Sequence, residues 1–109
     1  MYDQLNDEEF CKEMDKLLKQ FFSKKYDINK VLEDHFNKSL SSIRQRFKLN
    51  RRTTIAKYRD EILAQIASRM LKRKNCFDVM LHCGFSNPSH FAMWFRKMHG
   101  VNPSEYLTY

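Results

Sequence analysis

The amino-acid sequence predicts an all-α fold for this chain of 109 residues. Apolar residues recur at three- and four-residue intervals through most of the chain, which is the spacing of one helix face. Both glycines and both prolines lie between Gly84 and Pro103, so the preceding part of the chain lacks the strongest helix breakers. A composition of 42% hydrophobic and 30% charged residues suits a packed helical domain.

The first predicted helix starts after Asn6 or Asp7, since either residue can act as an N-cap. Acidic residues at its start suit the positive end of the helix dipole. Its apolar stripe predicts a packing face up to residue 22, made of Phe10, Met14, Leu17, Leu18, Phe21 and Phe22.

Two further short helices form a helix-turn-helix pattern. The first follows the N-cap Asp27 and ends at Asn37, because Asn is the commonest replacement for Gly in a left-handed turn. The second begins near Leu40 and turns Ile43 and Phe47 inward. The positions that then lie outward or at the flanks are Ser41, Ser42, Arg44, Gln45 and Lys48.

A loop at residues 49–54 leads to a long connector helix, for which Ile55 to Leu71 keep helical spacing on a broad apolar face. The basic run at residues 72–74, followed by Asn75, predicts its end. Sixteen or so residues at a rise of about 1.5 Å give a rod of about 25 Å.

The glycines and prolines mark a second helix-turn-helix. A short helix from Asp78 to Cys83 is stopped by Gly84, and the next helix has Asn87 as its cap, Pro88 as its first residue and Gly100 at its end. Asn102 and Pro103 repeat this cap for a final short helix.

Charge is unevenly distributed along the chain. Residues 1–36 carry six Lys and nine Asp or Glu, a net charge of −3. Residues 37–75 carry twelve Lys or Arg and two acids, a net of +10, while residues 76–109 carry two of each. The basic middle third predicts a polyanionic partner, with nucleic acid ahead of a membrane surface, since the apolar stripe beside it is too narrow for membrane binding.

Residues 27–107 resemble the DNA-binding region of AraC/XylS-type transcription regulators. The second helix-turn-helix matches the family signature at Gly84, Phe85, Ser89, Phe91, Phe95, Arg96, Gly100, Val101, Pro103 and Tyr106. The first helix-turn-helix and the connector match it at Ser39, Ile43, Phe47, Lys48, Tyr58, Ala67 and Leu71.

The resemblance implies two homeodomain-like helix-turn-helix lobes joined by a connector helix, with boundaries at residues 1–53, 54–72 and 73–109. Both recognition helices are then expected to enter successive major grooves, about 34 Å apart. By position, the base-reading residues are Ser41, Arg44, Gln45, Ser89, Ala92 and Met93. Expected phosphate contacts are Ser39, Arg46, Lys48, Arg51, Arg52, Lys57, His90, Arg96 and Lys97.

Several positions depart from the family pattern. Glu33 and Met80 stand four residues before the two turns, where the family often has a small residue, and Met93 stands where the second recognition helix usually carries Arg. The other departures are Asn37 and Arg52 in place of Gly and Leu63 in place of Arg. With the zero net charge of residues 76–109, these departures predict that the first lobe dominates base reading.

The predicted function is therefore a sequence-specific DNA-binding transcription regulator, more often an activator, that binds double-stranded DNA and can contact RNA polymerase. The alternative is a regulator-like interaction module that modulates another transcription factor or the polymerase, with weak or no specific DNA binding. The chain has no room for a separate ligand-binding or dimerisation domain, so we expect a short stand-alone regulator or a fragment of a longer one.

Enzymatic activity is not expected. The sequence contains no Gly-rich phosphate loop, no nucleophile elbow and no HExxH. No cofactor or metal is expected either, because Cys83, His82 and His90 lack ordinary zinc spacings, and three cysteines without a CxxC pair suit reduced thiols. Without a signal peptide or an apolar run of spanning length, the expected location is the bacterial cytoplasm, at the nucleoid when DNA is bound.

Overall fold

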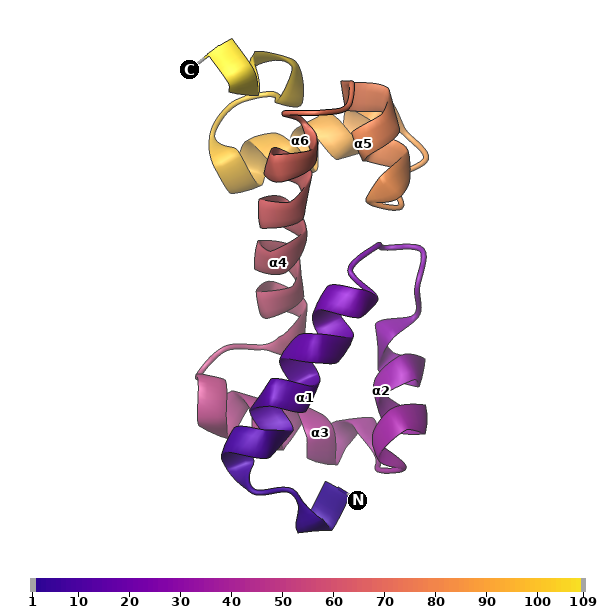
Figure 1. Cartoon of the computed structure of the whole chain (residues 1–109), viewed down its shortest axis with the longest axis vertical. Coiled ribbons are helices and arrows are strands. Elements are labelled where there is room, and N and C mark those ends of the chain that lie inside the picture. The colour runs from indigo at the N-terminus through magenta and orange to yellow at the C-terminus, as the bar shows by residue number, and fades with distance from the viewer. Residues whose placement is uncertain (1, 109) are drawn as a thin grey trace. The chain divides into compact units, whose positions relative to one another are not determined.

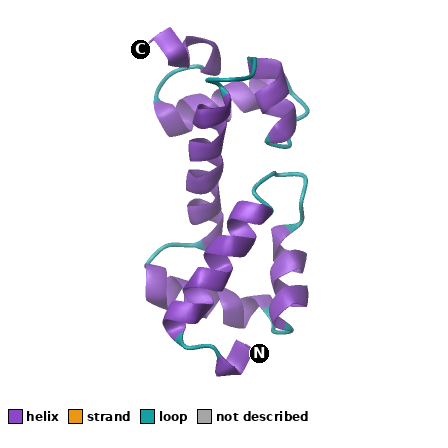
Figure 2. Cartoon of the chain, viewed as in Figure 1, coloured by secondary structure: helices purple, strands orange, loops and turns teal. Residues whose placement is uncertain are grey.

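The computed structural model describes residues 2–108, and this part of the chain contains helices and no strands (Figures 1 and 2). The predicted all-α fold is confirmed. The α-helices are α1 (Asp7–Gln20), α2 (Ile28–Phe36), α3 (Leu40–Arg51), α4 (Ile55–Met70), α5 (Cys76–His82) and α6 (Pro88–His99). Two 3₁₀ helices flank them, η1 (Tyr2–Gln4) and η2 (Pro103–Thr108).

The described residues form two compact units. Unit 1 contains residues 2–22 and 26–59, and unit 2 contains residues 23–25 and 60–108. Helix α4 therefore contributes its first turn to unit 1 and its remainder to unit 2. The lobe boundaries at residues 1–53, 54–72 and 73–109 stay predictions.

Helix α1 begins with a complete capping box. The side-chain oxygen of Asn6 accepts a hydrogen bond from the Glu9 backbone N–H at 2.8 Å, and Glu9 Oε1 accepts one from the Asn6 N–H at 3.0 Å. Asn6, and not Asp7, is thus the N-cap, and Asp7 lies in the first turn, where its charge suits the helix dipole.

The turn between α2 and α3 follows the sequence prediction. Asn37 lies in the left-handed region at φ 50° and ψ 47°, so it ends α2 as a glycine would. Ser39 caps α3, since its hydroxyl accepts a hydrogen bond from the Ser42 backbone N–H at 3.3 Å. These local signals fix where α3 starts.

Helix α3 is longer than the sequence predicted. Residues 49–51, expected as the start of a loop, continue the helix. Arg52 ends it in the left-handed region at φ 57°, and its N–H donates to the Lys48 carbonyl at 2.8 Å. Asn50 also donates from its side chain to the Arg46 carbonyl at 2.9 Å, which satisfies a group in the last turns of the helix.

Helix α5 starts two residues earlier than predicted, at Cys76 in place of Asp78. The sequence assigned Asn75 to the end of the preceding helix. In the structure Asn75 is the N-cap of α5, because its side-chain oxygen accepts a hydrogen bond from the Asp78 N–H at 2.8 Å. The final helix η2 is a 3₁₀ helix that begins at Pro103 as expected.

The core of unit 1 is built from α1, α2 and α3. Its fully buried side chains include those of Phe10, Met14, Leu18, Leu32, Ile43 and Phe47. Tyr2, from the unpredicted helix η1, adds an aromatic ring to this core, with its centroid 5.6 Å from that of Phe10 in an edge-to-face arrangement. The ring of Phe10 lies 5.4 Å from that of Phe36. This packing holds α3 from its inner side.

The core of unit 2 is aromatic. Phe91, Trp94 and Phe95 of α6 are all buried. Phe85, in the turn before α6, lies 5.3 Å from Phe91 and 5.2 Å from Trp94 between ring centroids. Val79 of α5 is also fully buried, so the two helices of this unit share one apolar core.

Gly84 does more than stop α5. It has a φ of +87°, and a Cβ at this position would lie 2.5 Å from Ser23 Oγ and 2.6 Å from the Lys25 backbone nitrogen. The Lys24 N–H donates to the Cys83 carbonyl at 2.9 Å, and the Lys24 ammonium lies 4.8 Å from the centroid of the Phe85 ring. Residues 23–25 therefore pack directly against the turn between α5 and α6.

Candidate nucleic-acid interface

Helix α3 has a buried side and a hydrophilic outer side. Ile43 and Phe47 have no exposed surface, which fixes the rotation of the helix about its axis. The side chains that this rotation leaves exposed include those of Ser41, Arg44, Gln45 and Lys48. The three base-reading residues predicted for the first lobe, Ser41, Arg44 and Gln45, thus lie on the exposed side of one helix.

Arg44 and Gln45 carry hydrogen-bonding groups that nothing within residues 2–108 engages. Neither side chain has a hydrogen bond, an ion pair or a ring contact with another described residue, and Arg44 lies one residue after the fully buried Ile43. A guanidinium and a primary amide held on a fixed helix, without partners in the described part of the chain, are available to an external acceptor or donor.

Arg46, on the same helix, is held within unit 1. Its Nε lies 3.0 Å from Asp7 Oδ1, its Nη1 donates to the Tyr2 carbonyl at 3.2 Å, and its Nη2 donates to the Leu5 carbonyl. The guanidinium carbon also lies 4.6 Å from the centroid of the Phe10 ring. Burial by itself lowers the pKa of Arg46, but the hydrogen bonds with Asp7 and Tyr2 raise it above its ordinary value.

Arg51, at the end of α3, also pairs with a carboxylate, that of Asp15. Its Nη2 lies 2.7 Å from Asp15 Oδ2, and its Nη1 donates to the Tyr58 hydroxyl at 2.9 Å. The hydrogen bond with Asp15 raises the pKa of Arg51 well above its ordinary value despite partial burial. Arg46 and Arg51, both expected at phosphates from the sequence, therefore have intramolecular carboxylate partners.

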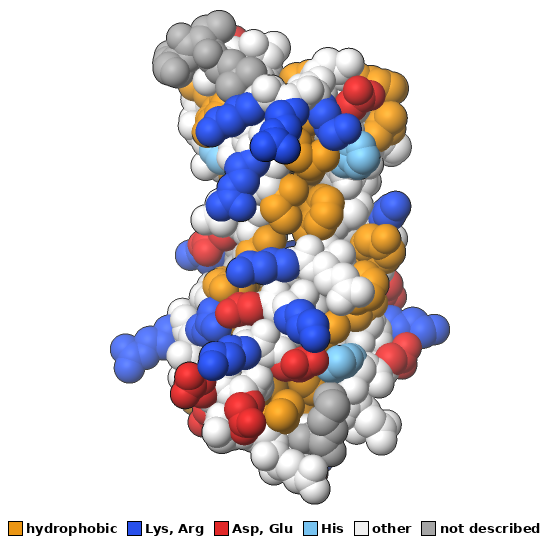
Figure 3. Space-filling view, in the orientation of Figure 1, with side chains coloured by type: hydrophobic (Ala, Val, Ile, Leu, Met, Phe, Trp, Pro, Cys, Tyr) orange, Lys and Arg blue, Asp and Glu red, His pale blue; other side chains and the backbone are white. Residues whose placement is uncertain are grey.

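Helix α1 supplies the acids for both arginines. Asp7 and Asp15 lie two turns apart on α1 and reach two different positions of α3. On the face of unit 1 seen in Figure 3, acidic and basic side chains lie next to one another. The cations of unit 1 that have no ion pair among residues 2–108 are therefore other residues. They include the exposed Arg44, Lys48, Arg52 and Lys57.

Helix α6 of unit 2 presents a different surface. Asn87 caps it with hydrogen bonds from the N–H groups of Ser89 at 2.8 Å and His90 at 3.1 Å. Ser89 and Met93 lie one turn apart and are exposed, Met93 by 69%. Ala92 is half-buried, at the flank of this exposed side. The cations of the helix, Arg96 and Lys97, and the ring of His90 are also exposed.

A family model described as a helix-turn-helix domain matches residues 32–109, from the middle of α2 onward. The matched family is of the AraC type. The chain belongs to the AraC-type helix-turn-helix family. The resemblance inferred from the sequence is confirmed, and the AraC-type match covers α3 and α6 while α1 lies outside it. Searches of curated proteins and of solved structures gave no match.

Membership of the AraC-type family indicates a DNA-binding regulatory domain for transcription, with double-stranded DNA as its ligand. The family is not one of enzymes. Within residues 2–108, no helix combines the length and apolarity needed to cross a bilayer.

The histidines and cysteines described by the structure take part in no cluster that could hold a metal ion. In the described range, no three side chains of His, Cys, Asp or Glu lie close enough together to hold a metal ion. Cys83 is buried, and burial raises the pKa of its thiol to about 11, so the thiol stays protonated near neutral pH. The zinc ligand set of His82, Cys83 and His90 considered from the sequence is therefore not assembled.

Leu49, expected from the sequence at the start of a loop, lies in the last turns of α3, and 75% of it is exposed. It follows Gln45 by one turn, so it extends the outer side of α3 toward Arg52. Because residues 49–51 continue the helix, Leu49 lies on the side of α3 opposite the buried Ile43 and Phe47.

Proposed function

We propose that this protein is a sequence-specific DNA-binding transcription regulator in which α3 of unit 1 does most of the base reading. In this proposal α3 enters a major groove with Ser41, Arg44 and Gln45 toward the base edges. Arg44 donates two hydrogen bonds to guanine O6 and N7, and Gln45 pairs with adenine N6 and N7. Leu49 adds apolar contact at the same surface.

The observation that carries the proposal is the contrast among the arginines of α3. Arg46 and Arg51 are held by Asp7 and Asp15, whereas Arg44 has no partner among residues 2–108. An unpaired arginine on a fixed helix can bond to an external acceptor without breaking an ion pair, whereas the paired ones must first break or share one.

Phosphate contacts fall in this proposal to the exposed residues around α3, which are Ser39, Lys48, Arg52 and Lys57. Arg46 and Arg51 keep α3 in place and add positive potential, and they reach phosphate only by sharing their carboxylate partners. The contacts proposed for unit 2 are His90, Arg96 and Lys97. Contacts of this kind supply affinity that depends on salt and carry no base preference.

Helix α6 has the smaller part in base reading. Residues 76–109 carry no net charge, and the exposed Met93 offers apolar contact, for example to a thymine methyl group. The Ser89 hydroxyl can donate a hydrogen bond to a base edge or accept one from it. Ala92 is half-buried and reaches less far. From the AraC-type resemblance, the proposal also includes activation at promoters with RNA polymerase as a partner.

Fluorescence anisotropy on a duplex selected from random DNA, and on a scrambled duplex of equal length, tests the proposal. Arg44→Ala should cost about 1–3 kcal/mol on the selected duplex and relax the preference at one base pair. Lys48→Ala should weaken both duplexes alike and reduce the salt slope by about one. Lys19→Ala, on the exposed surface of α1, is the matched control and should change neither affinity.

Equal losses for Arg44→Ala on the two duplexes would remove Arg44 from the reading set. Selection that yields no preferred sequence at moderate ionic strength would exclude specific DNA binding altogether. Footprinting on the selected site then shows whether one groove or two are protected, which measures the part of α6 directly.

A second candidate function is a protein-interaction module that modulates another transcription factor or RNA polymerase. Among residues 2–106, three of the five exposed large apolar side chains lie on α5 and α6, namely Phe77, Leu81 and Met93. Apolar surface of this kind suits a protein partner better than a phosphate backbone. A salt titration separates the two functions, because a DNA reader loses affinity steeply with salt and still prefers one sequence.

A further inference from the structure

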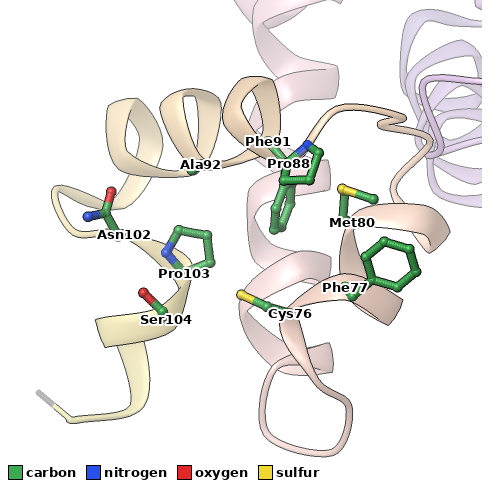
Figure 4. A pocket seen from close by; sticks show the side chains of 9 residues that line it. All are labelled: Cys76, Phe77, Met80, Pro88, Phe91, Ala92, Asn102, Pro103 and Ser104. Carbon is green, nitrogen blue, oxygen red and sulfur yellow. The ribbon is translucent and has the colours of Figure 1, made fainter.

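Unit 2 contains a cavity of about 380 Å³. It lies where α5, the first turns of α6 and the start of η2 meet (Figure 4). The side chains that line it are those of Cys76, Phe77, Met80, Pro88, Phe91, Ala92, Asn102, Pro103 and Ser104.

The sequence explains why space remains at this crossing. Met80 stands four residues before the turn, where a small residue would let the two helices approach closely, and its side chain is buried with 2% exposure. Cys76 and Ala92, on the facing walls, are too small to fill the gap that a longer residue leaves beside them. Pro88 and Pro103 each begin a helix, so the backbone on two sides is conformationally restricted.

The lining is apolar at one end and polar at the other. Figure 4 shows Phe77 and Met80 on one side and Asn102 and Ser104 on the opposite side. None of the nine lining side chains carries a charge. Cys76 adds a thiol whose pKa is raised by burial, so the thiol contributes no negative charge near neutral pH.

Asn102 provides an unused acceptor at the polar end. Its Nδ2 donates to Glu105 Oε1 at 3.3 Å, which fixes the amide and leaves Oδ1 without a hydrogen-bond partner in the described part of the chain. Phe91 and Phe77 offer aromatic surfaces, and Met80 offers a thioether, a group that makes favourable contacts with aromatic rings.

We propose that this cavity binds a small uncharged aromatic molecule that carries one hydrogen-bond donor. Its volume falls in the range of roughly 300–1,000 Å³ found for small-molecule sites, and a dry cavity of about 150 Å³ already admits benzene. A charged ligand would lose its hydration with no opposite charge in the lining to compensate. This inference does not depend on DNA binding, so the failure of either proposal leaves the other standing.

Titration of the full ¹⁵N-labelled chain with indole tests the proposal by two-dimensional NMR. Indole is uncharged and aromatic and carries one N–H donor. We expect saturable shifts at the lining residues, and we expect benzoate, a charged aromatic, to bind at least about tenfold more weakly.

Two variants fill the cavity from different walls. Cys76→Phe and Ser104→Phe should each weaken indole binding about tenfold or more, while Cys76→Ser, which keeps the volume, should stay within about threefold of the wild type. Circular dichroism checks that each variant folds. If Cys76→Phe does not fold, Ser104→Phe decides the comparison, because residue 104 is exposed.

Three outcomes would overturn the proposal. Shifts that do not saturate up to the solubility limit of indole, or that map outside the lining, exclude a site here. Unchanged binding by both filled variants excludes this cavity as the site. Self-association of the wild type that Cys76→Phe abolishes would show that a second copy covers the cavity in place of a small molecule.

Discussion

Asp15 and Arg51 form a short ion pair, 2.7 Å between Oδ2 and Nη2, that joins the middle of α1 to the end of α3. Both side chains are about three-quarters buried, with 25% and 29% exposure. The hydroxyl of Tyr58, on α4, donates to Asp15 Oδ1 at 2.8 Å and accepts from Arg51 Nη1 at 2.9 Å. Three helices of unit 1 thus meet in one hydrogen-bonded triangle.

Asp15→Asn should destabilise unit 1 by about 1–2 kcal/mol, because it removes the charge opposite a partly buried guanidinium and weakens both hydrogen bonds. Urea unfolding followed by circular dichroism measures the loss. The control is Glu8→Gln, whose pair with Lys12 is 3.4 Å long and has 78% and 75% exposed side chains. It should change the free energy of unfolding by less than about 0.5 kcal/mol. Equal effects of the two substitutions would mean that the triangle adds nothing to stability.

The raised pKa of Tyr58 predicts that the free energy of unfolding falls at alkaline pH. Burial and the hydrogen bond to Asp15 raise the pKa of Tyr58 above its usual value. The unfolded chain then ionises this phenol first, so its contribution to stability is complete below about pH 10 and is lost as the pH rises through the folded-state pKa. The stability advantage of the wild type over Tyr58→Phe should therefore shrink above about pH 10. A constant difference across the alkaline range would contradict the raised pKa.

The two glycines offer a matched pair. Both have positive φ, +87° at Gly84 and +81° at Gly100, but a Cβ at Gly100 meets nothing within 4 Å, whereas at Gly84 it meets the backbone of residues 24 and 25. Gly100→Ala should cost about 1–2 kcal/mol from backbone strain alone. Gly84→Ala should cost a further 1–3 kcal/mol or so, since backbone must shift. Thermal unfolding measures the loss of stability in each variant. Equal losses would mean that residues 23–25 move away from an added Cβ at residue 84 without a cost in free energy.

Leu49→Ala separates a surface contact from a core contact. With 75% of Leu49 exposed, the substitution should change the free energy of unfolding by less than about 0.5 kcal/mol. Under the proposed function it should weaken binding to the selected duplex about threefold or more, as measured by anisotropy. Phe47→Ala, at a fully buried position of the same helix, should cost about 3–5 kcal/mol of stability. A stability loss for Leu49→Ala close to that of Phe47→Ala would mean that Leu49 packs in the core and is not exposed.

Local signals in the sequence placed the helices well. Asn37, Asn87 and Gly100 end or cap helices as predicted because a single side chain, or its lack, decides the backbone conformation there. The end of α3, which was not predicted correctly, is also decided by the backbone conformation of a single residue. Arg52 adopts the left-handed region that the sequence alone would reserve for Gly or Asn, so the helix ends three residues later than its composition indicated.

The sequence predicts the exposure of the candidate site residues only where that exposure depends on helix periodicity. The exposure of Arg44 and Gln45 follows from the burial of Ile43 and Phe47, which share their helix. The partners of Arg46 and Arg51 lie 39 and 36 residues away in the chain, so no local pattern identifies them. The cavity of unit 2 likewise depends on the volumes of side chains from three separate segments, which the sequence does not bring together.

Helix α4 belongs to both units, and this shared membership bears on how the protein folds and unfolds. An isolated helix of 16 residues is only marginally stable in water, so each part of α4 needs the side chains packed on it in its own unit. Melting of either unit removes that support from one part of a continuous series of helical hydrogen bonds, and fraying can then spread along the helix. The chain should consequently lose its helices in one cooperative transition, although it contains two compact units.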